Sequence, residues 1–554
     1  MRGRHVFMDS LSAHGVRYIF GNPGTTENPL IGTLSDYPDL QYILTLHEGI
    51  AIGAASYYAQ ASGNTGLVNL HAAPGLGNGL GMLYGALKAN SPVIVTAGQQ
   101  DTRMRLREPL LSHDLVAMAA PLTKWSTQVE RVDEIADIMR RAFKIAHDPP
   151  AGPVFVALPI DVMERETDVG AANAGDLFRA ASADPAGISA VVNCLLASKK
   201  PVVVAGDDVA RSGANDDLVR LAEAVGASVW FEGLHQRIAF PTGHPNARGG
   251  LPFDAARIAA ALRGADLVVL AGGPFFEEVW YSDGSPFPAG ARVVQIEEST
   301  ARLAFNHPVV AGLVGHLPST LAAIGQNLRQ RANAAFASAA GERNTELRKK
   351  KADAASFQKL RVEQAWNREP PSLLRVVEEI RRGLPPNTIV VDESITASSD
   401  LGRTIQFETA DDYFGGRGGG IGQGLAGAIG VKLGHPDRPQ IAISGDGSAM
   451  YSIQALWTAA HHDLAIVFAI LANREYRVLK HNMDNYRQRF DVPSNEGYPQ
   501  MDLHEPVLGF VELAAGMGVA GTRVTESDEI SAAIKSAFDS GKPHLVEIIM
   551  ERKA

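Results

Sequence analysis

The chain has 554 residues, a net charge of −10 at pH 7 and an ordinary globular composition, with 45% hydrophobic residues. At about 150 residues per domain, this length predicts three domains. The acidic balance argues against nucleic acid or an anionic membrane as a main partner. Cys194 is the only cysteine, which excludes an intrachain disulfide and favours a cytoplasmic location. The N-terminus lacks an apolar signal core, and no run of about 18 apolar residues predicts a membrane span.

The first third of the chain alternates short apolar runs with helical segments, which is typical of a doubly wound α/β domain. We assign this domain to residues 1–167. Glu48 directly follows one predicted strand and His71 follows another, and the Gly-rich stretch 72–78 is predicted to be a loop. Strands are expected at 16–20, 42–46, 66–70, 92–97 and 154–158, and helices at 4–14 and 49–62.

A second α/β domain is predicted for residues 186–335, between two connecting segments. Residues 168–185 are rich in Ala, Gly and Asp and lack periodicity, which indicates a linker. Residues 332–368 are charged and mostly helical, and their Lys349–Lys351 run is interpreted as a solvated helix face. Strands of this domain are expected at 201–205, 228–230, 267–270 and 292–296.

The third domain, residues 365–554, contains the stretch IAISGDGSAMYSIQALWTAAHHDLAIVFAILAN at 441–473. An apolar run, a sharp turn, an amphipathic segment and a second apolar run predict one βαβ unit. Its right-handed crossover places Asp446 and Asn473 at the carboxyl ends of neighbouring parallel strands, where open α/β sheets bind ligands. A carboxylate and an amide oxygen there suit a hard cation such as Mg²⁺ that carries phosphates.

Several motifs resemble those of the thiamine diphosphate-dependent 2-oxo acid decarboxylases and carboligases, most of all the benzoylformate decarboxylase group. The resemblance covers essentially the full chain. It implies an α/β protein of three doubly wound parallel-sheet domains: one for the cofactor pyrimidine, a central one and one for the diphosphate. The motifs are GNPGTTE, TLHEGIAIGAASYYAQASG, NLHAAPGLGN, VTAGQQ, PTGHPNARG and the run AGAIGVKLG…ISGDGSAMYSIQALWTAA.

The resemblance implies a reaction and its catalytic residues. Thiamine diphosphate would decarboxylate a benzoylformate-like 2-oxo acid through a C2 ylid and an enamine. Glu48 matches the glutamate that hydrogen-bonds to the pyrimidine ring and promotes ylid formation. His71 matches a histidine near the reacting carbonyl that could give or take a proton. Thr25 stands where benzoylformate decarboxylases carry a serine that contacts the substrate carboxylate.

The same resemblance implies how the cofactor is held. Asp446, Asn473 and the backbone carbonyl of Glu475 match the Mg²⁺ ligands, and Ca²⁺ or Mn²⁺ could substitute. Ile421 matches the aliphatic residue that keeps the cofactor bent. Gly447 and Ser448 match diphosphate donors at a helix N-terminus. Further cofactor contacts are expected at Gly445, Glu393, Asn78 and Tyr476.

The expected substrate pocket departs from the family at one position. Leu110 and Leu111 match apolar residues that line the pocket. Val279, however, stands where benzoylformate decarboxylases use a second histidine. Proton transfer after decarboxylation would then need water, His71 or another donor, or would be slow. Slow protonation would favour carboligation to an aldehyde, so an acetolactate synthase-like or benzoin-type C–C lyase or ligase is the alternative.

The loop that follows the second strand of the βαβ unit is unusually charged. Arg474 and Arg477 could bind an anionic tail of the substrate, or they could form ion pairs at a subunit interface; the sequence leaves both open. Residues 480–493 are expected to cover the site and to influence specificity.

Other cofactors and functions are disfavoured. FAD is not expected, because residues 186–335 hold no dinucleotide fingerprint, and Gly418–Gly422 does not open the Rossmann unit of a dehydrogenase. The retained catalytic and metal-binding residues argue against a paralogue that binds cofactor without turnover. The expected partners are a small 2-oxo acid or aldehyde and further copies of the chain. The family forms each site between two subunits, which implies at least a dimer and most commonly a tetramer.

Overall fold

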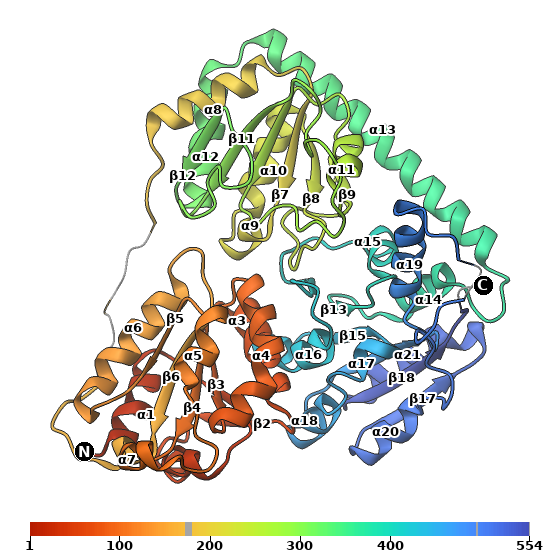
Figure 1. Cartoon of the computed structure of the whole chain (residues 1–554). Coiled ribbons are helices and arrows are strands. Elements are labelled where there is room, and N and C mark those ends of the chain that lie inside the picture. Colours follow the sequence, from red (N-terminus) through yellow and green to blue (C-terminus); the bar gives the residue numbers. More distant parts are fainter. Residues whose placement is uncertain (172–174, 176–179, 495–496, 553–554) are drawn as a thin grey trace. The chain divides into compact units, whose positions relative to one another are not determined.

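Three six-stranded parallel sheets flanked by helices form the protein, as the computed structural model shows (Figure 1). This architecture confirms the prediction of three doubly wound α/β domains. The structure describes residues 1–171, 175, 180–494 and 497–552. Residues 1–177, 368–396 and 416–554 form one compact unit, and residues 178–367 and 397–415 form a second. Within the described residues, no helix has the length and apolarity needed to cross a membrane.

The N-terminal sheet has the strand order β2-β1-β3-β4-β6-β5, and its neighbouring strands are parallel. Its strands are β1 (Tyr18–Gly21), β2 (Gln41–Leu44), β3 (Gly66–Leu70), β4 (Val93–Gln99), β5 (Trp125–Gln128) and β6 (Val154–Pro159). Its helices are α1 (Gly3–Ala13), α2 (Asn28–Ile31), α3 (Glu48–Ser62), α4 (Ala72–Lys88), α5 (Leu115–Ala119), α6 (Ile135–His147) and α7 (Ile160–Glu164). Short 3₁₀ turns are η1 (Thr25–Glu27), η2 (Leu34–Asp36), η3 (Thr102–Arg107), η4 (Ala120–Leu122) and η5 (Val132–Glu134).

The C-terminal sheet has the order β14-β13-β15-β16-β18-β17, which is the same arrangement in chain order as the N-terminal sheet. Its strands are β13 (Ile389–Glu393), β14 (Tyr413–Gly415), β15 (Gln440–Gly445), β16 (Val467–Ala472), β17 (Ala520–Val524) and β18 (His544–Ile549). The helices of this region are α14 (Leu373–Gly383), α16 (Gln423–Gly434), α17 (Asp446–Ala449), α18 (Ala455–His461), α19 (Arg477–Arg489), α20 (Phe510–Gly516) and α21 (Ile530–Asp539), with a 3₁₀ turn η6 (Ser527–Glu529).

The central sheet, in the second unit, has the order β12-β11-β10-β7-β8-β9. Its strands are β7 (Pro201–Ala205), β8 (Ser228–Phe231), β9 (Ala247–Gly250), β10 (Leu267–Ala271), β11 (Arg292–Glu297) and β12 (Ala311–Val314). The helices are α8 (Pro185–Ala197), α9 (Asp207–Arg211), α10 (Asn215–Val225), α11 (Ala255–Ala261), α12 (Leu317–Arg331), α13 (Ala334–Ala365) and α15 (Ser398–Thr404). The long helix α13 confirms that the charged segment 332–368 is helical (Figure 1).

Small residues let α3 and α16 pack at close range. A methyl group added to Gly53 would lie 2.8 Å from the Cβ of Ala426, and one added to Gly430 would lie 1.9 Å from the carbonyl oxygen of Ala54. A Cβ at Gly434 would lie 2.8 Å from the Cβ of Ala61, so early residues of one helix face early residues of the other and late residues face late ones. The two helices therefore run in the same direction. Glu48, the first residue of α3, therefore lies at the same end of the pair as the start of α16.

Helix α18 contacts the edge strand β2. The backbone N–H of Leu44 donates to Nε2 of His462 at 3.0 Å, and Oγ1 of Thr458 donates to the carbonyl oxygen of Leu44 at 3.2 Å. On its other side β2 pairs with β1. At Leu44, the edge of the N-terminal sheet is thus hydrogen-bonded by side chains of the C-terminal region.

Some expected elements differ from the observed ones. The stretch 72–78 is not a loop but the first turns of α4, in which Pro74 occupies an early position that needs no N–H donor. The single helix expected after Gly445 is divided into α17 and α18. Strands β5, β9, β12 and β14 were not predicted; all four are edge strands. The lower burial of β5, β9 and β12 weakens their apolar signal. Strand β14 is buried but only three residues long. The proposed linker 168–185 lies partly outside the described residues, and the domain boundaries stay predictions.

Candidate active site

His71 and Glu27 form a buried pair at the carboxyl edge of the N-terminal sheet. His71 directly follows β3 and precedes the first residue of α4, while Glu27 ends η1 after β1. Nδ1 of His71 lies 2.8 Å from Oε2 of Glu27 and 3.2 Å from Oγ1 of Thr26. The Glu27 side chain is 1% exposed and the His71 side chain 22% exposed. The carboxylate thus lies below the surface, and the imidazole lies between it and the exterior.

The Glu27 carboxylate is surrounded by donors. Oε2 accepts from the backbone N–H of Gly24 at 2.8 Å and faces His71, whereas Oε1 accepts from Thr26 Oγ1 at 2.7 Å and from the N–H of Gly98 at 2.9 Å. Two donors on each oxygen use the full acceptor capacity of a carboxylate. A side chain at Gly98 would remove this arrangement, because its Cβ would lie 2.1 Å from Oε1. Glu27 is therefore held in one orientation.

This geometry determines what His71 could do. A carboxylate that faces Nδ1 favours the tautomer with its proton on Nδ1. Nε2 then remains to accept or donate a proton at the outer side of the pair. A histidine held in this way is suited to general acid–base chemistry.

Glu48 lies close to the same histidine. It is 8% exposed at the first position of α3, and its Oε2 accepts a hydrogen bond from Nδ2 of Asn78 at 3.1 Å. A Cβ at Gly75 would lie 3.2 Å from Oε1 of Glu48 and 3.5 Å from the Cβ of His71, so both residues border the same glycine. The structure thus brings together Glu48, Asn78 and His71, three residues that the family resemblance implied as site residues.

The other residues expected on this side are placed less closely. Thr25 is exposed, and its neighbour Thr26 instead contacts His71 and Glu27. The Leu110 side chain is 81% exposed, and its carbonyl accepts from Gln100 Nε2 at 2.8 Å. The carbonyl of Leu111 accepts from the N–H of Ala73 at 3.3 Å. The Leu110–Leu111 loop is therefore attached to the first turn of α4, directly after His71.

Asp446 and Asn473 lie at the ends of two adjacent strands of the C-terminal sheet, as the βαβ prediction requires. Strand β15 ends one residue before Asp446, β16 ends one residue before Asn473, and Gly445 pairs with Leu471 in the parallel register. Oδ1 of Asp446 accepts from the N–H of Gly447 at 2.8 Å, and Oδ2 accepts from the N–H of Arg474 at 2.5 Å. Burial raises the pKa of Asp446 to about 6, against the lowering effect of these two donors.

The donor set of this edge suits a hard cation. A carboxylate, an amide oxygen and a main-chain carbonyl are the oxygen ligands that Mg²⁺ prefers. Oδ1 of Asn473 accepts from the N–H of Glu475 at 3.0 Å, which joins two of the three predicted ligand residues directly. Among the described residues, no cluster of three or more His, Cys, Asp or Glu could hold a metal. A cation here would therefore depend on this mixed set of oxygen donors.

The two glycines that flank Asp446 differ in the space around them. A Cβ at Gly445 would meet nothing within 4 Å, whereas a Cβ at Gly447 would lie 2.5 Å from the ring of Tyr476. Tyr476 therefore packs directly on Gly447. Ser448 is buried in α17, which is a single helical turn of four residues rather than the long helix expected.

Glu393, whose expected cofactor contact stays a prediction, binds the start of α16. Its carboxylate accepts from the N–H groups of Gly422, Gln423 and Gly424 at 2.6, 2.9 and 2.8 Å. Burial raises the pKa of Glu393 to about 7, although these three donors oppose the rise. A carboxylate at a helix N-terminus also complements the helix dipole. Through this contact Glu393 fixes the position of Ile421, which is half-buried just before α16.

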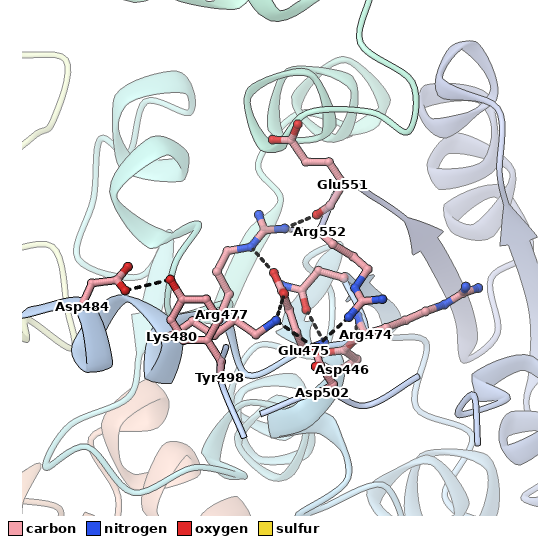
Figure 2. A network of polar contacts seen from close by, with 11 residues as sticks. Asp446, Arg474, Glu475, Arg477, Lys480, Asp484, Tyr498, Asp502, Glu551 and Arg552 are labelled. Carbon is pink, nitrogen blue, oxygen red and sulfur yellow. Dashed lines mark hydrogen bonds and ion pairs between the residues drawn. The ribbon is translucent and has the colours of Figure 1, made fainter. Parts of the chain in front are cut away.

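The charged loop after Asn473 contains a buried ion-pair network (Figure 2). The Glu475 carboxylate accepts from Nε of Arg477 at 3.0 Å and from Nζ of Lys480 at 2.6 Å. The Arg477 side chain is 9% exposed and pairs with Glu475 of its own chain; its two expected roles stay predictions. Arg474 extends away from this network, and within the described residues its side chain forms no hydrogen bond or ion pair (Figure 2).

Two further predicted features can be located. Val279 belongs to the second unit; its side chain is 59% exposed and its N–H donates to the carbonyl of Phe253 at 3.0 Å. The expected cover at 480–493 begins inside α19, with the buried Lys480. Their proposed roles stay predictions.

Sequence reasoning missed Glu27 and Thr26. Glu27 is the last residue of the motif GNPGTTE, and its contact with the N–H of Gly24 is that of a helix-capping turn. The separate contact with His71 joins residues 44 positions apart, and no local pattern reports it. The available signal was an acidic residue in a Gly-rich turn directly after a buried strand.

Three family models match successive parts of the chain: the N-terminal TPP binding domain of thiamine pyrophosphate enzymes over residues 1–118, the central domain over 188–324, and the C-terminal TPP binding domain over 396–548. The chain belongs to the thiamine pyrophosphate (thiamine diphosphate) enzyme family, as its motifs indicated.

Individual proteins of this family are similar to this chain over nearly its full length. The chain is 33% identical over 542 residues to the benzoylformate decarboxylase of Pseudomonas aeruginosa, with 97% of each protein covered. It is 26% identical to the acetolactate synthase large subunit of Corynebacterium glutamicum, covering 100% of this chain and 87% of that protein. Among solved structures, the 4-hydroxybenzoylformate decarboxylase of Rhodococcus jostii RHA1 is similar with a TM-score of 0.86, 30% identity and full coverage of both chains.

Proposed function

We propose that the protein catalyses decarboxylation of a benzoylformate-like 2-oxo acid with thiamine diphosphate and Mg²⁺. The observation that carries this proposal is the Glu27–His71 pair beside Glu48, in a chain similar over its full length to a benzoylformate decarboxylase. This arrangement combines a buried carboxylate, a histidine with one nitrogen directed outward and a second carboxyl group oriented by an amide.

The residues of both sheet edges fit the proposed cofactor. When bound, thiamine diphosphate supplies a carbon nucleophile and an electron sink. Glu48 would hold a proton at the pyrimidine ring, with Asn78 orienting its carboxyl group. Asp446, Asn473 and the Glu475 carbonyl would hold Mg²⁺ and, through it, the diphosphate. The open space at Gly445 would admit a phosphate oxygen close to the backbone.

Three residues would act on the substrate. His71 would deliver or remove a proton through Nε2, while Glu27 fixes the ring and compensates its positive charge. Leu110 and Leu111, attached to the first turn of α4, would cover an aromatic substituent and exclude water.

A carboligase is a second candidate function. At Val279 the chain lacks the second histidine of the benzoylformate decarboxylases. The carbon that loses CO₂ must take up a proton before an aldehyde is released. If that proton arrives slowly, the same carbon can attack an aldehyde and form a C–C bond. Similarity to an acetolactate synthase also supports this candidate.

We also propose that the working form is at least a dimer, with the tetramer as the commonest arrangement. Large apolar side chains are exposed in the segments that follow strand ends: Leu46 at 47%, Leu106 at 90%, Leu110 at 81% and Tyr451 at 57%. Their burial against another copy of the chain would remove this apolar surface from water, which supports the proposal. Light scattering that finds only monomers at working concentration would contradict this proposal.

The function can be tested in two steps. Thermal unfolding with and without thiamine diphosphate plus Mg²⁺ should show stabilisation of about 2.7 kcal/mol when the ligands are at 100 times their dissociation constants. A panel of 2-oxo acids, with and without added aldehydes, then separates CO₂ release from ligated products by mass spectrometry. Equal stability with and without both ligands would defeat the cofactor assignment. Inactivity with every aromatic 2-oxo acid would defeat the substrate assignment.

A further inference from the structure

The Glu475 side chain makes buried ion pairs that its backbone carbonyl would not need in order to bind a metal. The carboxylate is 0% exposed, in the loop that also carries Asn473. Removing a carboxylate from water costs several kcal/mol unless charged partners and hydrogen bonds compensate for it. Arg477 and Lys480 supply that compensation from one side of the loop. We call Glu475, Arg477, Lys480 and Asp502 the Glu475 clamp.

The clamp joins three segments that are distant in the sequence. Nζ of Lys480 contacts Asp502 Oδ1 at 2.8 Å in addition to Glu475, and Arg552 contacts the same Asp502 oxygen at 2.7 Å. Arg477 also donates to the carbonyl oxygen of Glu551. The loop after β16, the segment near residue 502 and the chain after β18 are thereby connected through charged side chains (Figure 2).

Backbone contacts transmit this connection to the predicted metal ligands. The N–H of Tyr476 donates to the carbonyl of Met501 at 2.9 Å, and the N–H of Leu503 donates to the carbonyl of Arg474 at 2.8 Å. The N–H of Glu475 donates to the side-chain oxygen of Asn473. The peptide groups on both sides of Glu475 are thus fixed, together with the Asn473 amide.

We propose that the Glu475 clamp is a positioning device for the divalent cation: it holds the Asn473 side chain and the Glu475 carbonyl at the spacing that the cation requires. The inference deepens the proposed function and depends on it. The clamp residues touch neither substrate nor cation with their side chains. They act by reducing the number of conformations open to the loop that carries Asn473 and Glu475. A loop that is already ordered does not lose conformational entropy when it binds the metal.

The test measures Mn²⁺ binding by electron paramagnetic resonance, in the full chain with thiamine diphosphate present. Glu475→Gln should weaken Mn²⁺ by about 10-fold to 100-fold, the usual effect of losing a group that orients a metal ligand. Lys480→Met should weaken it less, and Lys480→Arg should restore near wild-type affinity because it keeps the charge.

Glu547→Gln is the matched control. Glu547, in β18, is a similarly buried glutamate, with its side chain 2% exposed, and it accepts from Nε of Arg523 in the neighbouring strand β17 at 2.8 Å. This variant should lose thermal stability while its Mn²⁺ affinity stays within twofold of wild type. If Glu475→Gln and Lys480→Met behave in the same way, the clamp is only structural and the inference is wrong.

The remaining outcomes are also decisive. If wild type binds neither Mn²⁺ nor thiamine diphosphate, the proposed function fails, and the inference fails with it. If wild type binds both and the clamp variants bind equally well, the inference alone fails. If Glu475→Gln does not fold, the comparison of Lys480→Met with Lys480→Arg decides, because both keep a long side chain at that position.

Discussion

The N-terminal and C-terminal sheets share one strand arrangement, but their carboxyl edges carry different chemistry. At the N-terminal edge His71 is hydrogen-bonded to Glu27, and Glu48 beside them is hydrogen-bonded to Asn78. These residues are suited to moving protons. The C-terminal edge presents Asp446 and Asn473, supported by buried ion pairs, and is suited to holding a cation. The topology thus specifies where a site lies, while the residues at the strand ends specify what it does.

The comparison predicts that variants at the two edges fail in different measurements. Asp446→Ala should give the largest effect, because it removes the only carboxylate among the expected cation ligands. We expect cofactor-induced thermal stabilisation to disappear and activity to fall by more than about 100-fold, since the proposed cation anchors the diphosphate. Retained stabilisation by thiamine diphosphate plus Mg²⁺ would show that the C-terminal edge does not bind the cation through Asp446.

Glu48→Gln should be nearly as damaging to turnover, but not to binding. Proton transfer by a positioned carboxyl group contributes about 100-fold to 10,000-fold, and kcat should fall within this range. Thermal stabilisation by the cofactor should remain close to that of wild type. An active variant, or one that no longer binds cofactor, would remove the distinction between a proton-transferring edge and a binding edge.

Glu27→Gln should reduce kcat by about 10-fold to 100-fold through His71. The amide replaces one acceptor oxygen with an NH₂ group, so at least one of the N–H donors around it loses its acceptor. The informative comparison sets kcat against the free energy of unfolding of the ligand-free protein. A purely structural role would lower the free energy of unfolding while kcat of the folded protein stays at the wild-type value.

Paired glycine variants test the two edges without ligands. Gly98→Ala should destabilise the ligand-free protein by about 1–3 kcal/mol, because the added methyl group would overlap Oε1 of Glu27. Gly445→Ala should leave the ligand-free protein within about 0.5 kcal/mol of wild type, because the space there is open. Urea unfolding measures both variants. Equal losses would contradict the difference in packing between the edges.

The smallest expected effect concerns the contact between the two regions at His462. Burial, with a contribution from His461, lowers the pKa of His462 below its ordinary value of 6.5. Only the neutral ring can accept from Leu44, so the stabilisation is present above pH 6.5 and is lost as the pH falls through the lowered pKa. The melting temperature should therefore drop more between pH 7.5 and pH 5 in wild type than in His462→Gln, whose amide oxygen still accepts.

Much of the fold could be predicted from the sequence because the interior strands are buried on both faces. The predicted strands 66–70 and 201–205 coincide with β3 and β7, whose residues are all buried. Edge strands such as β5 and β9 lack that continuous apolar signal. The stretch 72–78 was misassigned because its glycines and proline usually interrupt helices, whereas here close packing and an early proline position permit one.

The candidate site could be predicted where it follows strand ends, and less well where it depends on distant contacts. Asp446, Asn473, Glu48 and His71 all directly follow expected strands or begin the next helix. The partner of His71 could not be inferred, because Glu27 meets it only after β1 and β3 pair in the sheet. The binding of Arg477 inside its own chain likewise depends on the buried Glu475 carboxylate.

The contact at Leu44 has a consequence for the behaviour of the protein in concentrated solution. An exposed edge strand is a template onto which another chain can add a strand, and this route leads to aggregation. Because His462 and Thr458 occupy the N–H and carbonyl of Leu44, a foreign strand could not pair with β2 at that residue without displacing α18. The contacts that begin at α18, which follows the proposed cation site, therefore oppose strand addition to β2 at Leu44.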